Sequence, residues 1–490
     1  MAASASDTPE TAVSGGRLPL LVKIVYGSGE WGIASFGTIR TLLLGIFFTD
    51  VVGIDPRLAS IAVLFGVLWD AVNDPLVGII TDRGIMGERV RARWGRRRPF
   101  LLVFAIPYGL SFLAMWVAPS WNSQLALLVH ITLAYALSDT MFTLVTVPFF
   151  ALTPELTPDF DERTTLATFR MLFNLLASLV TAVVAPEIVG AAATPRQGYI
   201  TVALIFGSLA ALPFLAIFFA TRNLSTGDPT EEAPPFATSF REAWQNVPFR
   251  SATIIYLLNW AAVDLVALVL PFFITYWLEG GNRNAQATLP LVGPLAIESL
   301  LFGIFLGTAA LALPLWWYLS KRFDKRTAYV VGMSFWLLVQ LLFITVRPGQ
   351  RTYVYVLAFL GGMGVSTAHV LPESLFPDVM EWDELFTGKR REGVFYGVRT
   401  FVRKVTAAGA LALALQILGA YGYRQPPPGA TVFQQSPQTL GAIRILVGPV
   451  GALFLLGAIA VALFYPLTRE RHERVRRLLA RRKARASAHS

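Results

Sequence analysis

Cysteine is absent from this chain of 490 residues, and histidine occurs only four times. The lack of cysteine excludes disulfide bonds, thiol catalysis and metals bound by cysteine. The histidines are scattered and form no metal-ligand pattern. Charged residues make up only 15% of the chain, whereas soluble domains contain about a quarter. Together with 54% hydrophobic residues, this composition predicts that lipid surrounds most of the chain.

Apolar runs of about twenty residues recur along the sequence, and each is long enough to cross a hydrocarbon core about 30 Å thick. They predict twelve membrane-spanning helices at 20–49, 56–80, 99–118, 124–151, 167–190, 199–220, 250–278, 294–319, 327–346, 351–376, 393–420 and 439–466. The preceding residues, 1–19, lack the charged start and apolar core of a signal peptide, so we expect a disordered cytoplasmic tail.

The net charge of +10 is concentrated in connections that alternate along the chain. Arg-rich or Lys-rich connections follow spans 2, 8, 10 and 12, and all of these lie on one side of the membrane if the span count is correct. Because basic loops stay in the cytoplasm, we expect both termini there, in a bacterial-type inner (plasma) membrane. The same clustering indicates contact with anionic lipid headgroups rather than with nucleic acid.

A long polar connection, 222–248, divides the predicted spans six and six. The predicted fold is therefore an all-α polytopic membrane protein with two bundles, 20–221 and 249–466, a cytoplasmic linker between them and a basic cytoplasmic tail at 467–490. This layout resembles the major facilitator plan, in which substrate binds between the bundles near the middle of the membrane. The pathway lies within one chain, so a monomer is sufficient.

The strongest candidate site lies on the second predicted span. Asp70 and Asp74 are four residues apart and share one helix face, with Asn73 beside them. Two carboxylates this close both stay ionised in a dry interior only when a cation lies between them; otherwise one takes a proton. We therefore expect an ion-coupling site for Na⁺ or H⁺, with no further metal or cofactor. The alternative is that both acids pair with basic side chains on other helices.

Other polar residues inside predicted spans are candidates for the substrate pathway, because an ionisable group in a membrane is costly and usually functional. Lys404 lies deep in span 11, and we expect it to face a cavity. The further substrate-binding candidates are Thr146, Arg40, Asp139, Arg170, Trp260 and Tyr396. For the charged members, ion pairs between helices are the alternative.

The loop after span 2 combines an acid with a basic cluster. Asp82 ends the span, and Arg96, Arg97 and Arg98 precede the next one. Basic residues in such a loop set the topology of the chain. We also expect these four residues to form ion pairs between helices that break during gating.

Six segments resemble the glycoside–pentoside–hexuronide:cation symporters, the melibiose permease-like family of the major facilitator superfamily. They are FFTDVVG (47–53), WDAVNDPLVGIITDR (69–83), RWGRRRPFLL (93–102), VPFFALTPEL (147–156), DERTTLATFRM (161–171) and DVMEWDELFTGKRREGVFYGVRTFVRK (378–404). The resemblance implies that Asp70 and Asp74 bind the coupling cation and that Lys404 is the family's span-11 lysine. The two aspartates that hold sugar hydroxyls in the permease fall here on Ala34 and Thr146.

The loss of those aspartates makes a melibiose-like galactoside a poor substrate, and Arg40 with Lys404 favours an anionic one such as a uronide. The predicted function is cation-coupled symport of a sugar or sugar derivative, and not an enzymatic activity. A lysophospholipid or other organic-anion symporter of the same fold is the alternative, which a hydrophobic lateral opening between spans 5 and 8 would favour. A non-transporting membrane sensor is a remote alternative, because no nucleophile–base pair and no appended soluble domain occur. The sequence also lacks a GxxxxGK[ST] loop, which argues against ATP-driven transport.

Overall fold

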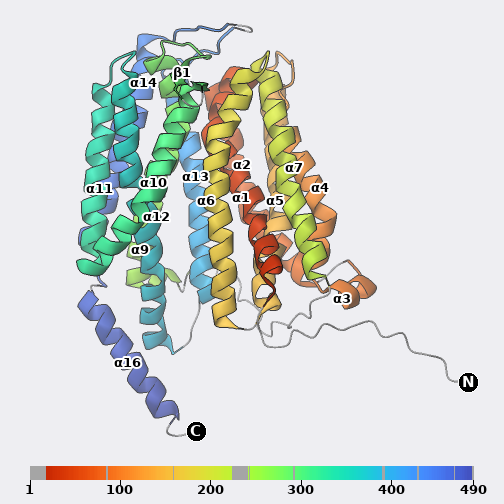
Figure 1. Cartoon of the computed structure of the whole chain (residues 1–490), viewed down its shortest axis with the longest axis vertical. Coiled ribbons are helices and arrows are strands. Elements are labelled where there is room, and N and C mark those ends of the chain that lie inside the picture. Colours follow the sequence, from red (N-terminus) through yellow and green to blue (C-terminus); the bar gives the residue numbers. More distant parts are fainter. Residues whose placement is uncertain are drawn as a thin grey trace, which may run out of the picture.

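The computed structural model describes residues 18–83, 86–157, 159–222, 241, 243–290, 293–388, 392–427, 430–467 and 469–487, which are almost entirely helical (Figure 1). The N-terminal half contributes α1 (Leu20–Ile46) and its π-helical continuation η1 (Phe47–Val52), α2 (Pro56–Arg83), α3 (Glu88–Trp94), α4 (Arg98–Met115), α5 (Gln124–Leu156), α6 (Phe160–Ala191) and α7 (Pro195–Thr221). Most of the predicted N-terminal tail and linker lie outside the described residues.

The C-terminal half is also mainly helical. It contributes α9 (Val247–Phe272) with η2 (Phe273–Leu278), α10 (Ile297–Arg322), α11 (Lys325–Leu342) with η3 (Phe343–Thr345), α12 (Arg351–Thr387), α13 (Glu392–Ala420), and the consecutive segments α14 (Pro437–Ile445), η4 (Leu446–Val450) and α15 (Gly451–Leu463). An antiparallel hairpin of β1 (Gln286–Leu289) and β2 (Gly293–Ala296) lies between η2 and α10. The final helix, α16 (Arg469–Ser487), extends from the bundle beside the C-terminus (Figure 1).

The helices pack as two bundles. In the first, α1 contacts α6 and α7, α4 contacts α5 and α7, and α2 contacts α5. In the second, α9 contacts α13 and α15, α10 contacts α12, and α11 contacts α12 and α15. The bundles meet where α2 packs on α13, α6 on α10 and α1 on α9. The start of α1 and the helix α16 lie at one end of the molecule, which we call the terminal end; the β1–β2 hairpin lies at the opposite, distal end (Figure 1).

Close helix crossings depend on residues without side chains. A Cβ atom added at Gly109 of α4 would lie 2.7 Å from the carbonyl oxygen of Gly207 on α7. A Cβ added at Gly32 of α1 would lie equally close, 2.7 Å, to the carbonyl oxygen of Ala210. In a membrane, where lipid offers no hydrophobic driving force between helices, such close backbone packing supplies much of the association energy.

The described residues include eleven helices that are long and apolar enough to cross a membrane. A further helix of 37 residues, α12, packs beside α10 and α11. The prediction of an all-α polytopic membrane protein is confirmed. Some helices extend beyond the predicted spans: α6 begins at Phe160, before the span start at 167, and α12 continues to Thr387, beyond the span end at 376. The polar residues beyond the apolar core continue the helix, because helical hydrogen bonding does not require lipid.

Candidate functional site

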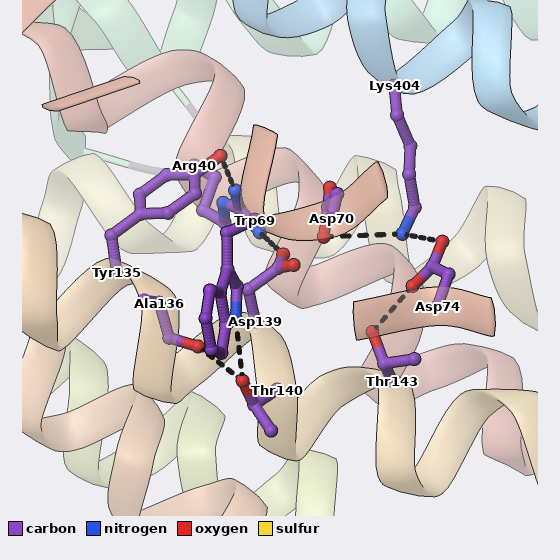
Figure 2. Close-up of polar contacts among 10 residues, drawn as sticks. All are labelled: Arg40, Trp69, Asp70, Asp74, Tyr135, Ala136, Asp139, Thr140, Thr143 and Lys404. Atoms are coloured by element: carbon purple, nitrogen blue, oxygen red, sulfur yellow. Dashed lines mark hydrogen bonds and ion pairs between the residues drawn. The ribbon is translucent and has the colours of Figure 1, made fainter. Parts of the chain in front are cut away.

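A lysine from one bundle lies between two aspartates from the other (Figure 2). Asp70 and Asp74 project from the same face of α2, and Lys404 reaches them from α13. The Lys404 Nζ atom is 2.6 Å from Asp74 Oδ2 and 3.5 Å from Asp70 Oδ1. The side chains are partly buried, with 13% of Asp70, 33% of Asp74 and 25% of Lys404 exposed. The ammonium group therefore satisfies the charge requirement of this carboxylate pair from across the bundle interface.

Thr143 on α5 is a third contact of the same carboxylate. Its hydroxyl donates a hydrogen bond of 3.0 Å to Asp74 Oδ1, so Asp74 links α5, α2 and α13. Sequence reasoning did not choose Thr143 as a site residue. The pattern that could have identified Thr143 is its position on one α5 face with Asp139 and Thr146, at spacings of four and three residues.

Two polar atoms beside this ion pair have no hydrogen-bond partner. They are Asn73 Nδ2 and Asp70 Oδ1, and both are buried. Carboxylate, amide and hydroxyl oxygens are the hard ligands that Na⁺ prefers, and Asp70, Asp74, Asn73 and Thr143 supply all three kinds. The donor set fits a monovalent cation, and it fits a proton equally well, because either carboxylate accepts one.

A second ion pair lies on the other side of Asp70. Arg40 of α1 donates a hydrogen bond of 3.1 Å to Asp139 Oδ1 on α5 and another to the Tyr135 hydroxyl (Figure 2). The guanidinium carbon is 4.3 Å from the centre of the Tyr135 ring and 4.9 Å from that of Phe36. Asp139 is buried, and its Oδ2 atom has no hydrogen-bond partner. Arg40 is therefore already paired with a carboxylate and held by aromatic rings, as the alternative from the sequence anticipated.

Arg170 forms an ion pair within the first bundle. It donates hydrogen bonds of 2.9 and 2.5 Å to Glu30 Oε1, and Asn174 donates one of 3.1 Å to Glu30 Oε2. The guanidinium carbon lies 4.6 Å from the centre of the Phe150 ring. The charge of Arg170 is balanced, while its partly exposed edge stays available for hydrogen bonding.

Trp260 belongs to a corresponding cluster in the second bundle. Arg403 of α13 donates a hydrogen bond of 2.9 Å to Asp264 Oδ1 on α9, and its guanidinium carbon lies 4.1 Å from the Trp260 ring centre. The Trp260 indole N–H is buried without a hydrogen-bond partner. Asp264 thus lies in an ion pair between α9 and α13.

The basic loop makes contacts inside the first bundle. Arg97 donates hydrogen bonds of 2.7 Å to Glu155 Oε1 and to the carbonyl oxygen of Ala151, both on α5. Burial raises the pKa of the Glu155 carboxyl, although Arg97 and then Arg98 oppose the increase. Arg96 also lies close enough to lower the pKa of Glu155. The three arginines thus surround one carboxylate at the terminal end.

The structure gives less information on the remaining predicted site residues. Thr146 is buried on α5, three residues from Thr143. The side chains of Asp82 and Tyr396 lie outside the part of the structure that is described. The structure thus brings together Asp70, Asp74 and Lys404, with Arg40 and Asp139 nearby, and holds Arg170 and Trp260 in separate clusters (Figure 2).

The described helices pack as two bundles that share partly buried charged residues at their interface, which is the arrangement of a secondary transporter of the major facilitator type. The chain belongs to the MFS/sugar transport protein family, whose model matches residues 25–469. It is similar to an uncharacterized symporter of Synechocystis sp., with 30% identity over 96% of this chain and 98% of that one. The prediction of a transporter rather than an enzyme is confirmed, and the protein is a symporter of this superfamily that acts on small molecules.

Two further relatives carry more specific names. The isoprimeverose transporter of Lactiplantibacillus pentosus is 26% identical over 94% of this chain and 92% of its own length. The sodium-dependent lysophosphatidylcholine symporter 1 of Gallus gallus is 25% identical over 96% of this chain and 91% of its own length. Among solved structures, the nucleoside transporter NupG matches 90% of this chain and 99% of its own with a TM-score of 0.59 at 12% identity, which supports the fold alone.

Proposed function

We propose that this protein is a cation-coupled symporter for a sugar or sugar derivative, with Na⁺ or H⁺ bound at Asp70 and Asp74. The observation that carries the proposal is the Lys404 ammonium group, which lies within 3.5 Å of both carboxylates. An ammonium group and a small cation satisfy the same pair of negative charges, so they compete for it. Lys404 marks the position that a coupling cation takes in the rest of the cycle.

This competition links cation binding to movement. Asp70 and Asp74 belong to the first bundle and Lys404 to the second. A cation that binds the carboxylates neutralises part of their charge, so their attraction to Lys404 in the other bundle becomes weaker. Lys404 is then released to donate hydrogen bonds to a substrate oxygen. A ligand shifts a conformational equilibrium only through different affinities for the two states, and this exchange supplies such a difference.

The charges around the site favour one monovalent cation for each cycle. Three carboxylates (Asp70, Asp74 and Asp139) face two basic groups (Lys404 and Arg40). One further positive charge makes this cluster neutral, which is the favoured state inside a membrane.

The substrate we propose is a sugar or sugar derivative, in keeping with the isoprimeverose transporter among the relatives. The sequence favoured an anionic substrate because of Arg40 and Lys404. The structure weakens this argument, because Asp139 already neutralises Arg40. A substrate anion would therefore depend mainly on Lys404. The partly exposed edges of Arg170 and Lys404 and the indole N–H of Trp260 are suitable donors for hydroxyl or carboxylate oxygens.

A lysophospholipid is the second candidate substrate, supported by the named symporter of Gallus gallus and by the surface of α6. The middle of α6 exposes a series of apolar side chains, Met171, Leu172, Leu175, Leu176 and Val180. At about 100° per residue they cover about half of the helix circumference. That width accommodates an acyl chain entering beside α6 as well as contact with bulk lipid.

We further propose that both termini are cytoplasmic, so that the distal end faces outward. Support comes from the basic helices α3 and α16, which lie at the terminal end together with the start of α1 (Figure 1). Basic segments are retained on the cytoplasmic side of a membrane.

The test is uptake by purified protein in liposomes under an imposed Na⁺ gradient or an imposed pH gradient, with isoprimeverose, a glucuronide and lysophosphatidylcholine as separate solutes. The wild type is compared with the Asp70→Asn/Asp74→Asn variant and with Asp55→Asn. Asp55 is an exposed helix-start residue whose Oδ1 accepts from the Arg57 N–H, a role that asparagine also performs.

Gradient-driven uptake of a sugar that is lost only in the double variant supports the proposal. Uptake of lysophosphatidylcholine alone assigns the second candidate. Uptake that ignores both gradients and persists in the double variant would contradict cation coupling at these aspartates.

A further inference from the structure

A buried carboxylate at the distal end joins the two bundles. Asp50 lies in η1, has a completely buried side chain and accepts a hydrogen bond of 2.9 Å from the neighbouring Thr49 hydroxyl. The hydroxyls of Tyr276 and Tyr423 donate to its two carboxylate oxygens, and they lie 3.0 Å from each other. The Arg283 Nη2 atom lies 3.8 Å away. Every carboxylate oxygen is therefore satisfied without water.

These partners come from the other bundle. Asp50 ends the first helix of the N-terminal bundle, whereas Tyr276 lies in η2 and Tyr423 follows α13, both in the C-terminal bundle. Arg283 lies in the segment after η2, which is tied to the segment after α13 by the backbone hydrogen bond from Arg283 N–H to the carbonyl oxygen of Thr431, 3.0 Å. The three groups that hold Asp50 thus form one unit.

Further contacts between the bundles surround this unit. Ser60 donates a hydrogen bond of 3.0 Å to Gln416, and the backbone N–H of Ala296 donates one of 2.7 Å to Glu187. Gly53, with a left-handed φ of 79°, ends η1 so close to Gln425 that an added Cβ atom would lie 2.3 Å from its amide nitrogen. The distal end of the interface is therefore closed by direct contact between the bundles.

A polar cavity of about 90 Å³ lies beside the carboxylate. Glu187 and Tyr199 of the first bundle line it, together with Arg283 and Glu298 of the second. Arg283 thus lines this cavity and contacts Asp50.

We propose that Asp50, Tyr276 and Tyr423 form the latch that keeps the distal entrance of the transport pathway closed. A buried carboxylate is tolerated only while its hydrogen bonds are made, and here the opposite bundle makes them. The hydrogen bonds from the two tyrosine hydroxyls to Asp50 stabilise the closed state, and in the open state water replaces them. Without the two tyrosine hydroxyls, the buried Asp50 carboxylate lacks hydrogen bonds in the closed state, whereas water satisfies it in the open state. The closed state is therefore destabilised, and the population shifts toward the open state.

The natural lack of cysteine makes the test direct. A single cysteine replaces Ala408, which is buried on α13 four residues from Lys404 and further toward the distal end. A membrane-impermeant maleimide is added on the distal side of sealed vesicles, and the rate at which it labels this cysteine is measured. Protease access to a C-terminal tag fixes the sidedness of the vesicles beforehand, so the readout requires neither a substrate nor a coupling ion.

We expect Tyr276→Phe/Tyr423→Phe to raise the labelling rate about fivefold or more, since each lost hydrogen bond to a charged group is worth more than about 1 kcal/mol. In an Asp50→Asn background the same tyrosine changes have a smaller effect, because no buried charge is left underbonded. Tyr353→Phe is the matched control: its hydroxyl contacts Thr345, 3.0 Å away, inside the C-terminal bundle.

Both single tyrosine variants are measured as well, so that a poorly folded double variant still leaves the question decidable. Labelling rates that stay at the wild-type value in the tyrosine variants overturn the latch. So does an equal increase in Tyr353→Phe. Failure of the proposed cation coupling would leave this result unchanged, because no ion gradient is used.

Discussion

Lys404 Nζ and Asp74 Oδ2 are 2.6 Å apart, although the two residues are separated by 330 positions in the chain and belong to different bundles. The contact is partly exposed, with 25% of the Lys404 side chain and 33% of the Asp74 side chain accessible. An ion pair that is both accessible and shared between two moving bodies can be exchanged for another cation during a transport cycle. This relationship makes Lys404 the first residue to test.

Replacement of Lys404 by Gln should separate cation binding from transport. Without the competing ammonium group, the Asp70–Asp74 pair is expected to bind Na⁺ or H⁺ about tenfold more tightly, a change of about 1.4 kcal/mol. Gradient-driven uptake should be lost, because no group on α13 then responds to the cation. Intrinsic Trp fluorescence during cation titration, with choline as the control ion, measures the first effect, and liposome uptake measures the second.

Lys404→Arg is the matched control, since it keeps the positive charge. Its cation affinity should stay near that of the wild type. Weaker cation binding in Lys404→Gln than in the wild type would show that the lysine supports the site rather than competing for it.

Loss of the Thr143 hydroxyl should weaken the cation site directly. Thr143→Val keeps the shape of the side chain but removes the hydrogen bond to Asp74 Oδ1. The hydroxyl oxygen is also a ligand of the kind that Na⁺ prefers, so its loss is expected to lower the Na⁺ affinity about tenfold, a change of about 1.4 kcal/mol. Thr143→Ser should retain most of it. Equal affinities of the valine and serine variants, measured by the same fluorescence titration, would exclude the hydroxyl from the site.

The sequence predicts the local part of this site and much of the fold. Long apolar runs are sufficient to predict an all-α polytopic membrane protein, and the four-residue spacing of Asp70 and Asp74 is sufficient to place them on one helix face. These features depend only on helix geometry and on the cost of charge in lipid. They require no knowledge of how the helices pack.

Contacts between helices were the part that sequence reasoning left open or missed. The partner of Arg40 could be proposed only as an alternative, because any carboxylate at the right depth satisfies a buried cation. Asp50 was not selected at all, although it lies in the segment FFTDVVG, because its partners are two tyrosines more than two hundred residues away. Tertiary packing, not local pattern, determines these pairings.

The Arg40–Asp139 pair tests whether Arg40 serves structure or substrate. Arg40→Gln leaves the buried Asp139 carboxylate unpaired, and Asp139→Asn leaves the guanidinium unpaired; each is expected to destabilise the protein by about 3–5 kcal/mol. The double variant should recover a large part of that loss, since neither charge is then uncompensated. Unfolding in detergent measures the coupling energy. Additive losses would contradict the pairing, and unchanged uptake of an anionic solute by folded Arg40→Gln would remove the substrate role.

The pair between Lys23 and Glu162 predicts how stability changes with pH at the terminal end. The Lys23 ammonium donates a hydrogen bond of 2.9 Å to Glu162 Oε1, and the backbone N–H of Leu18 donates one of 3.2 Å to Oε2. The hydrogen bond from Lys23 is the main cause that lowers the pKa of Glu162 below its usual value of 4.5. The folded state therefore binds fewer protons than the unfolded state just below pH 4.5, so this contribution is complete at neutral pH and disappears as pH falls through the lowered pKa.

Glu162→Gln should accordingly be less stable than the wild type at pH 7 by about 1 kcal/mol, the upper range for a partly solvated ion pair. The difference should shrink as the pH is lowered below 4.5, where the wild-type carboxylate also becomes neutral. Thermal unfolding of both proteins across this range measures the difference. Asp55→Asn, an exposed acid at the other end of the molecule, controls for the general effect of acid on the detergent-solubilised protein. A stability difference that stays constant from pH 7 to pH 3 would mean that the glutamine acts through packing and not through the lost charge.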